Sequence, residues 1–170
     1  GQEAYTLFQS LATGHGGMST LHADSVAAVI HRLETEPMNI PRPLITSPNV
    51  ITIQQRLDRG GSPVRRTTMV AEIIELDSQT NEILTNGLFN YEPQDDSFSP
   101  LGRSYLLEKI ADQTGKSMPE INEELEDKTR ILAWMVDRDI RKFSDVTEII
   151  RNYYNDPDEV LKQVEVGARE

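Results

Sequence analysis

The side chains best suited to chemistry lie in a short stretch near the start of the chain. Residues 14–25 read Gly-His-Gly-Gly-Met-Ser-Thr-Leu-His-Ala-Asp-Ser, so that His15 and His22 flank a glycine pair and a short run with extended character. An imidazole titrates near neutral pH and serves as a general base, a metal ligand or a hydrogen-bond donor to phosphate. Residues 14–25 are therefore the first candidate for a functional site.

Three kinds of site would use these histidines. A metal site would need His31 or Asp24 as a further ligand, and the chain has no compact His-x-x-x-His pair. A nucleophilic site would pair Ser19 or Thr20 with His22 as the base, but the elbow motif that usually exposes such a serine is absent. A phosphate sensor fits best, because an imidazole can donate to a γ-phosphate while the glycines let the backbone move. A structural histidine beside an ordinary turn stays the alternative.

Three arginines form the second candidate group. Arg56, Arg65 and Arg66 are expected at strand ends on either side of a glycine turn at 60–63. They could form an arginine set that reaches phosphate across a subunit interface. They could equally form a solvated strand edge that blocks the addition of a further strand. The residues alone favour the edge interpretation.

The spacing of apolar residues predicts an α/β arrangement over the first hundred residues. Helices are expected over 2–13, closed by Gly14, and from an N-cap at Asp24 to the residue before Pro37. The prolines at 41, 43 and 48 predict an extended segment without helix. Strands are expected over 18–23, 50–55, 65–77 and 81–91, with turns at 60–63 and 77–80.

The remainder of the chain reads as a loop followed by a helical cluster. Residues 93–102 have the composition of a loop, and a helix is expected over 103–114, closed by Gly115. Ser117 with Glu120, and Asp145 with Glu148, predict two capping boxes at helix starts. Asp156 and Pro157 predict the start of a last short helix that ends near 164.

Composition excludes several classes of protein. The 170 residues are 37% hydrophobic and 26% charged, which indicates a globular chain. The net charge of −11 argues against a nucleic-acid partner, because phosphate neutralisation needs a basic face. There is no cysteine, which is consistent with a cytoplasmic location and excludes thiol chemistry. No apolar run approaches the roughly 18 residues of a membrane helix, so membrane association would have to run through a protein partner.

The motifs resemble those of a known family. Residues 1–4 and the run 12–25 resemble the start and the histidine box of the type II and type IV secretion ATPase superfamily. Further segments are similar to its archaeal branch, which drives archaella and type IV pilus-like machines. These segments are 53–56 (Ile-Gln-Gln-Arg), 65–66 (Arg-Arg), 71–73 (Ala-Glu-Ile), 85–93 (Thr-Asn-Gly-Leu-Phe-Asn-Tyr-Glu-Pro) with Asp96 and Phe98, 131–135 (Ile-Leu-Ala-Trp-Met) and 153–157 (Tyr-Tyr-Asn-Asp-Pro).

The resemblance implies a fold, a reaction and partners. It implies that residues 1–92 are the C-terminal part of a RecA-like P-loop ATPase domain, that 93–102 form a linker and that 103–170 form a helical subdomain. It implies a homo-hexamer that uses ATP and Mg²⁺ and moves an integral-membrane platform protein at the cytoplasmic membrane. It places His22, and with it His15, near the γ-phosphate. The arginines 56, 65 and 66 would help to complete the site between subunits.

One departure from the family pattern is large. The phosphate loop, Gly-x-x-x-x-Gly-Lys-Ser/Thr, and the acidic box do not occur in these 170 residues. We therefore expect this chain to be the C-terminal piece of a longer motor, and we expect that by itself it neither binds ATP tightly nor hydrolyses it. The alternative is a non-enzymatic interaction domain that docks on a membrane platform protein, with histidines that are structural.

Overall fold

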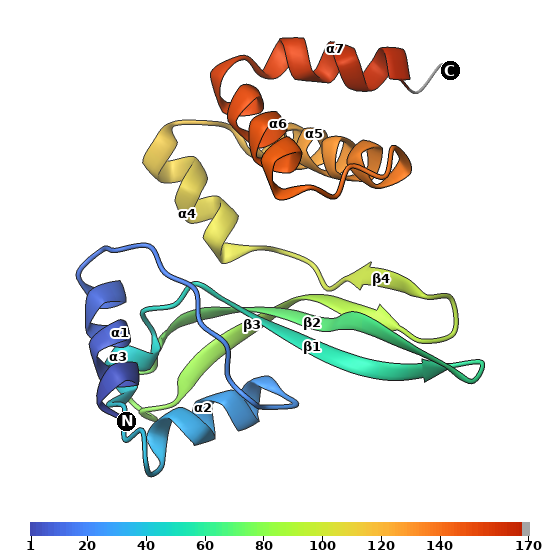
Figure 1. The fold of residues 1–170 in the computed structure, drawn as a ribbon. Helices are drawn as coiled ribbons and strands as arrows, with labels where there is room; N and C mark the ends of the chain where they lie inside the picture. Colours follow the sequence, from blue (N-terminus) through green and yellow to red (C-terminus); the bar gives the residue numbers. More distant parts are fainter. Residues whose placement is uncertain (168–170) are drawn as a thin grey trace. The chain divides into compact units, whose positions relative to one another are not determined.

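In the part of the chain that the computed structural model describes, residues 1–167, four strands form one antiparallel sheet in the order β1-β2-β3-β4 (Figure 1). The chain divides into two compact units, Gly1–Glu108 and Lys109–Glu170. The first unit contains the sheet and three helices, and the second is helical. The elements of the first unit are α1 (Gln2–Ala12), α2 (Val26–Glu34), α3 (Arg42–Ile45), β1 (Val50–Arg59), β2 (Ser62–Leu76), β3 (Ile83–Glu92) and β4 (Ser97–Pro100).

Strands β1 and β2 form a long hairpin, with 10 and 15 residues respectively. Its turn consists of Gly60 and Gly61, whose φ angles of 60° and 82° are the two positive values that a tight two-residue hairpin turn requires. Along β1 the side chains alternate, so that Ile51, Ile53, Gln55 and Leu57 are at least half-buried and the residues between them are exposed. The three predicted strands at 50–55, 65–77 and 81–91 are confirmed, and β1 and β2 each extend to the glycine turn.

Helices α1, α2 and α3 gather at the end of the sheet where β1 begins (Figure 1). Phe8, Leu33, Ile40 and Ile45 form the buried cluster that holds them together. The predicted helix over 2–13 is confirmed as α1, with Gly14 at φ +92° just beyond its end. The prediction that no helix follows Pro37 is wrong. Pro41 is the N-cap of α3 and Pro43 lies in its first turn, and at these positions a helix does not use the backbone amide that proline lacks.

Two predictions around residues 18–25 are also wrong. Residues 18–23 form no strand: they pair with none of the four strands of the described sheet, and Met18 is fully exposed. The N-cap of α2 is Ser25 rather than Asp24, and its Oγ accepts the amide of Ala28 at 3.2 Å. The carboxylate of Asp24 instead accepts a hydrogen bond from the Ser25 hydroxyl at 3.1 Å.

The loop predicted over 93–102 contains a strand. Asp96 adopts a φ of 56°, which turns the chain back so that β4 pairs with β3. The rings of Tyr91 and Phe98, which lie opposite each other in this pairing, have centroids 5.7 Å apart. Such a cross-strand aromatic pair favours the hairpin over an irregular loop.

The second unit packs three long helices, α5 (Met118–Asp137), α6 (Phe143–Asn155) and α7 (Pro157–Gly167). The members of its buried cluster come from all three helices: Ile131, Met135, Tyr153, Val160 and Val164. The capping box of Ser117 and Glu120 at the start of α5 is confirmed.

The two other predicted caps of the second unit have opposite outcomes. Asp156 caps α7, because its carboxylate accepts the amide of Glu159 at 3.2 Å. The capping box at Asp145 is wrong, since the N-cap of α6 is Lys142, three residues before Asp145, and no side chain caps this helix. Asp145 therefore lies in the first turn, where a carboxylate favours the helix dipole without capping it.

Glu72 connects the centre of the sheet to the helix that follows it. This carboxylate on β2 is only 1% exposed and accepts hydrogen bonds from Asn86 Nδ2 at 3.0 Å and from the amides of Tyr105 and Leu106 at 3.1 and 3.0 Å. The hydroxyl of Ser104 also donates to it, and Ser104 Oγ in turn accepts the amide of Leu107. Glu72 thus provides a negative charge at the N-terminus of α4 (Tyr105–Thr114).

The ionised form of Glu72 is the favoured one in the folded chain. Burial raises the pKa of this carboxyl, but the hydrogen bonds from Ser104, Asn86 and the amides of Leu106 and Tyr105 together outweigh burial and leave the pKa below its usual value. The carboxylate is therefore charged at neutral pH, and its burial is tolerated because its oxygens are well supplied with donors.

Replacing Glu72 by alanine is expected to lower the free energy of unfolding by about 2–4 kcal/mol, because the donors at the start of α4 lose a buried acceptor. Glu75→Ala is the matched control, since Glu75 is an exposed carboxylate on the same strand, and it should cost less than about 0.5 kcal/mol. Urea denaturation followed by circular dichroism measures both. Equal losses for the two variants would contradict the anchoring role of Glu72.

Candidate functional site

The two histidines lie on the irregular segment between α1 and α2. His15 is exposed, and its Nδ1 lies 3.3 Å from the carbonyl oxygen of Ser10 and 3.2 Å from Thr13 Oγ1. The imidazole of His22 is exposed and makes no hydrogen bond within residues 1–167. Both rings are therefore accessible to a ligand, and His22 has both nitrogens available.

Side chains from other elements hold this segment in place. Arg32 of α2 donates to the carbonyl oxygen of His22 at 3.1 Å. Gln55 of β1 donates to the carbonyl oxygen of Asp24 at 3.3 Å. Gln55 immediately precedes Arg56, so the segment with the histidines is attached to the strand that carries the first candidate arginine.

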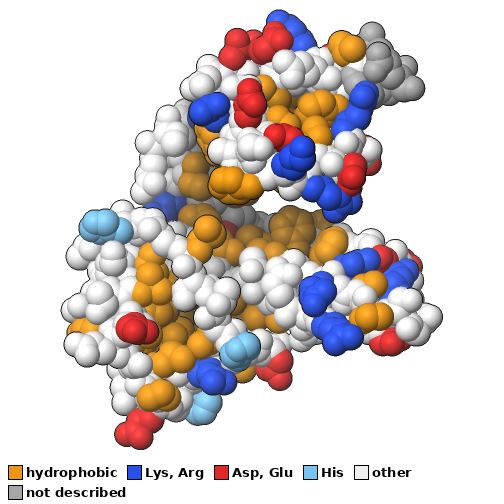
Figure 2. Space-filling model, in the orientation of Figure 1, with side chains coloured by type: hydrophobic (Ala, Val, Ile, Leu, Met, Phe, Trp, Pro, Cys, Tyr) orange, Lys and Arg blue, Asp and Glu red, His pale blue; other side chains and the backbone are white. Residues whose placement is uncertain are grey.

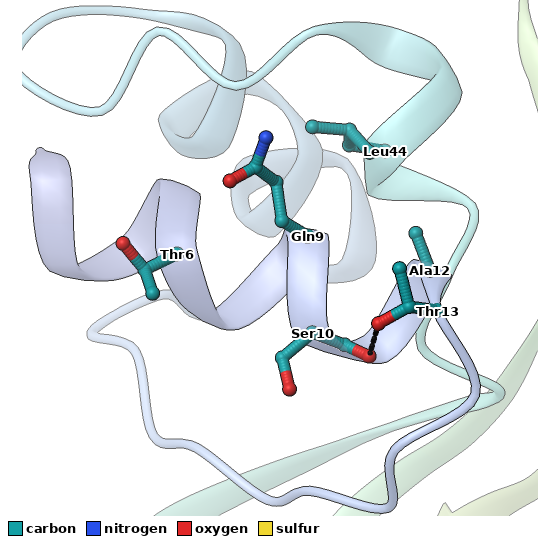
Figure 3. A pocket seen from close by; sticks show the side chains of 6 residues that line it. All are labelled: Thr6, Gln9, Ser10, Ala12, Thr13 and Leu44. Atoms are coloured by element: carbon teal, nitrogen blue, oxygen red, sulfur yellow. Dashed lines mark hydrogen bonds between the residues drawn. The ribbon is translucent and has the colours of Figure 1, made fainter.

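An open hollow lies beside α1, between this helix and Leu44 of α3 (Figure 3). Its lining side chains are all uncharged: Thr6, Gln9, Ser10, Ala12, Thr13 and Leu44. Figure 3 shows the Thr13 hydroxyl donating to the carbonyl oxygen of Ser10, at 2.9 Å. With no charged group in its lining, the hollow has no means to neutralise a phosphate, and we do not assign the chemistry to it.

Arg56 and Arg65 are brought together by the hairpin. They are directly opposite each other in the β1–β2 register, so both side chains stand on the same face of the sheet. Both are exposed, and neither guanidinium has an ion-pair or hydrogen-bond partner within residues 1–167. Figure 2 shows basic side chains gathered over this far end of the hairpin.

Arg66 belongs to a different cluster on the opposite face. It forms a bidentate ion pair with Asp96, with both N–O distances at 2.7 Å. Tyr91 donates to the same carboxylate at 2.8 Å, and Arg59 lies 3.3 Å from it. The sequence neighbours Arg65 and Arg66 therefore have different surroundings, because successive residues of a strand point to opposite faces.

The charges of this second cluster stabilise one another. The hydrogen bond from Arg66, followed by that from Tyr91, lowers the pKa of Asp96 far below the usual aspartate value, and the charge of Arg59 acts in the same direction. The same bond to Asp96 raises the pKa of Arg66. Asp96 thus holds the β3–β4 turn against the end of the β1–β2 hairpin.

Three residues of the region had no assigned role in the sequence analysis. Glu72, Asp96 and Gln55 were named only as members of the motifs shared with the family, without a role of their own. Glu72 accepts from residues 14 to 34 positions away, Gln55 donates to a residue 31 positions away, and Asp96 pairs with Arg66 30 positions away. No local pattern marks these contacts. A local signal is present for Glu72 alone: it is a carboxylate between two apolar residues, in the run Ala-Glu-Ile at 71–73.

Within 1–167, no group of three or more histidine, aspartate or glutamate side chains is placed to hold a metal ion. In the same part of the chain, none of the helices combines the length and the apolar character needed to cross a membrane.

Two family models match adjoining parts of the chain. Residues 1–95 match the family described as type II/IV secretion system protein. Residues 94–169 match the family described as PilB3-like, C-terminal. The first match covers the sheet, the histidines and the arginines.

Three proteins of Methanocaldococcus jannaschii, each described as uncharacterized, are similar to this chain. MJ1287 is 45% identical over 132 residues, which cover 78% of this chain and 49% of that protein. MJ0900 is 36% identical over 156 residues, which cover 89% of this chain and 28% of that protein. MJ0781 is 30% identical over 145 residues, which cover 85% of this chain and 20% of that protein. The chain spans less than half the length of each of these relatives.

The Asp96 cluster predicts a pH dependence. Because the folded-state pKa of Asp96 is depressed, its contribution to stability is complete above the unfolded value of about 3.9 and is lost as the pH falls through and below that value. Asp96→Asn should therefore lower stability at pH 7 and flatten its decline as the pH falls from 5 to 2. Denaturant titrations across this range measure the effect, with Asp95→Asn, an exposed neighbour, as the control. A decline as steep as in the unchanged chain would contradict it.

Proposed function

Because the chain belongs to the family of type II/IV secretion system proteins, we propose that it is the C-terminal part of a motor ATPase, in which it binds the phosphate groups of ATP through Arg56, Arg65 and His22. The proposed parent protein is a homo-hexamer of the archaeal type IV pilus or archaellum kind. Its RecA-like core would be completed by residues 1–92, and 103–170 would form a helical subdomain after a linker at 93–102.

The observation that carries this proposal is the pairing of Arg56 with Arg65. Like charges directly opposite each other destabilise an antiparallel pair by an amount on the order of 0.2–1 kcal/mol. No carboxylate within residues 1–167 offsets this repulsion by an ion pair. A phosphate group placed between the two guanidinium groups would offset it, because the planar fork of arginine suits phosphate oxygens.

Arg66 would act by positioning. Its ion pair with Asp96 fixes the end of the hairpin on the face opposite to Arg56 and Arg65. A rigid hairpin end lets the two free arginines meet a phosphate of a neighbouring subunit at small entropic cost. In this scheme the arginines neutralise charge that develops on the transferring phosphoryl group.

His22 would sense the γ-phosphate. Its exposed ring can donate to a phosphate oxygen, and the glycines at 16 and 17 allow its segment to move once that phosphate leaves. Through the bond from Gln55 to the segment, such a movement would reach the strand of Arg56. His15, which already contacts the end of α1, would have a supporting role in the same segment.

The remaining parts of the scheme belong to the longer protein. ATP would be held there with Mg²⁺ by a phosphate loop, and the metal ion would neutralise phosphate charge during hydrolysis. The assembly would lie at the cytoplasmic face of the membrane through an integral-membrane platform protein, and it needs no nucleic-acid partner. The alternative, a non-enzymatic docking domain, would leave the arginine pair without a ligand.

The double change Arg56→Gln and Arg65→Gln in the longer protein should lower kcat for ATP hydrolysis by at least about 10²-fold, because charge stabilisation in the transition state is lost. Arg151→Gln is the control for the loss of an exposed arginine elsewhere in the chain, since Arg151 lies on α6. A steady-state phosphate-release assay measures both. Hydrolysis within twofold of the unchanged protein would favour the docking domain.

His22→Ala in the longer protein should reduce hydrolysis by about tenfold or more, since one donor to the transferring phosphoryl group is removed. His31→Ala provides a matched control, because His31 is an exposed histidine on α2 outside the glycine segment. If His22→Ala keeps full hydrolysis, the sensor role is wrong. If His31→Ala has the same effect as His22→Ala, the loss comes from the fold and not from the phosphate.

A further inference from the structure

The segment that carries the two histidines lies outside the regular secondary structure. It runs over residues 14–25 as the irregular connection between α1 and α2 (Figure 1). Within residues 1–167, no backbone group of residues 16–24 forms a hydrogen bond with another backbone group. The direction in which His22 points is therefore set by contacts with other elements and not by a helix or a strand.

The first half of this segment has few restraints. Residues 12–20 are all exposed, and Met18 is fully so. A Cβ atom on Gly16 would have open space around it, with no atom beyond its chain neighbours within 4 Å. Gly17 lies closer to α1, where a Cβ atom would come within 3.0 Å of Leu11 Cδ2. The restraints that act on His22 are therefore found in the second half of the segment.

The second half is attached at three points. The side chain of Leu21 packs against the apolar cluster that holds α1, α2 and α3 together. Arg32 donates from Nη1 to the carbonyl oxygen of His22 at 3.1 Å. Gln55 donates to the carbonyl oxygen of Asp24 at 3.3 Å. Because Leu21 is half-buried and its neighbour His22 is exposed, these attachments hold the backbone and leave the imidazole facing outward.

The bond from Arg32 acts directly on the backbone of His22. Its acceptor is the carbonyl oxygen, so both nitrogens of the imidazole stay available. A donor that carries a charge makes a stronger hydrogen bond than a neutral one. Arg32 is exposed and forms no ion pair within residues 1–167, so no carboxylate competes with the carbonyl oxygen for its guanidinium group. The charge of Arg32 is thus directed at the residue on which the sensor role depends.

We propose that Arg32 is a positioning residue for His22: its guanidinium group holds the His22 carbonyl so that the imidazole is already oriented toward the γ-phosphate when ATP arrives. This role rests on the proposed function, in which His22 senses that phosphate. Orientation before binding matters, because a donor whose segment must first be ordered loses entropy as it binds. Gln55 would support the same orientation from β1, through its bond to Asp24.

A plain structural clip is the other role that such a bond could have. A clip stabilises the segment whether or not the imidazole is present. A positioning residue affects hydrolysis only through the imidazole, so its effect disappears once His22 is replaced. The two roles are therefore separated by measuring the order of the segment and, independently, the dependence of hydrolysis on Arg32 with and without the imidazole.

The first measurement uses the 170-residue chain without nucleotide. Arg32→Met removes the donor and should lower the NMR order parameters of the backbone amides of His22 and Ala23 from roughly 0.85 to below about 0.6. Arg32→Lys keeps one charged donor and should retain values near those of the unchanged chain. Gln54→Met is the control, because Gln54 donates to Thr67 and not to the segment. Unchanged order parameters in Arg32→Met would overturn the proposal.

The second measurement is steady-state ATP hydrolysis by the longer protein. Arg32→Met should lower kcat about three- to tenfold and leave KM for ATP within about twofold, because the imidazole contributes more to the transition state than to substrate binding. Arg32→Lys should restore most of this loss. In a protein that already carries His22→Ala, Arg32→Met should cause no further loss, because the group that it positions is absent.

The outcomes separate this inference from the proposed function. An equal loss from Arg32→Met with and without the imidazole of His22 would overturn the positioning role and leave the sensor role of His22 standing. If His22→Ala alone causes no loss, the sensor role is wrong, and the positioning role falls with it. Circular dichroism of each variant at the assay temperature shows whether unfolding is the cause of a loss.

Discussion

Glu72 joins the sheet of the first unit to the helix through which the chain leaves it. A carboxylate that is only 1% exposed would be costly by itself, yet this one accepts donors from β3, from Ser104 and from the first turn of α4. These bonds fix the start of α4 on the sheet, and the boundary between the two units falls within this same helix, after Glu108. A polar anchor therefore helps to set the position of β2, and of Arg65 on it.

The candidate arginines lie on the same strand pair as this anchor. Glu72 is opposite Val50 and Arg65 is opposite Arg56, six residues further along β1, about 20 Å away at the usual rise of a strand. One end of the hairpin is held by Glu72 and α4, and the other by Asp96 through Arg59 and Arg66. The two free guanidinium groups thus stand on a strand pair that is fixed at both ends, and such rigidity would suit the phosphate-binding role proposed for them.

Local patterns predicted the parts of the fold that depend on neighbouring residues. The helix α1, the strands of the β1–β2 hairpin with its glycine turn and the capping box at Ser117 all follow from residues within a few positions of each other. The strand β4 and the anchors at Glu72 and Asp96 depend on partners about 30 positions away or on a positive φ at Asp96, which local patterns do not reveal. Residues 18–23 had the composition of a strand, but they pair with no strand of the described sheet. Arg56, Arg65 and Arg66 were identified as a group, whereas the register separates Arg66 from the other two; the roles of these arginines and of His15 and His22 stay predictions.

Mixed assemblies of the longer protein test the central claim most directly. One kind of subunit would have the lysine of its phosphate loop replaced, and the other would carry Arg56→Gln with Arg65→Gln. If Arg56 and Arg65 complete the nucleotide site of a neighbouring subunit, mixtures of the two inactive kinds should regain ATP hydrolysis, because some interfaces then combine an intact phosphate loop with intact arginines. Hydrolysis by the mixture that does not exceed the sum of its two components would contradict the claim.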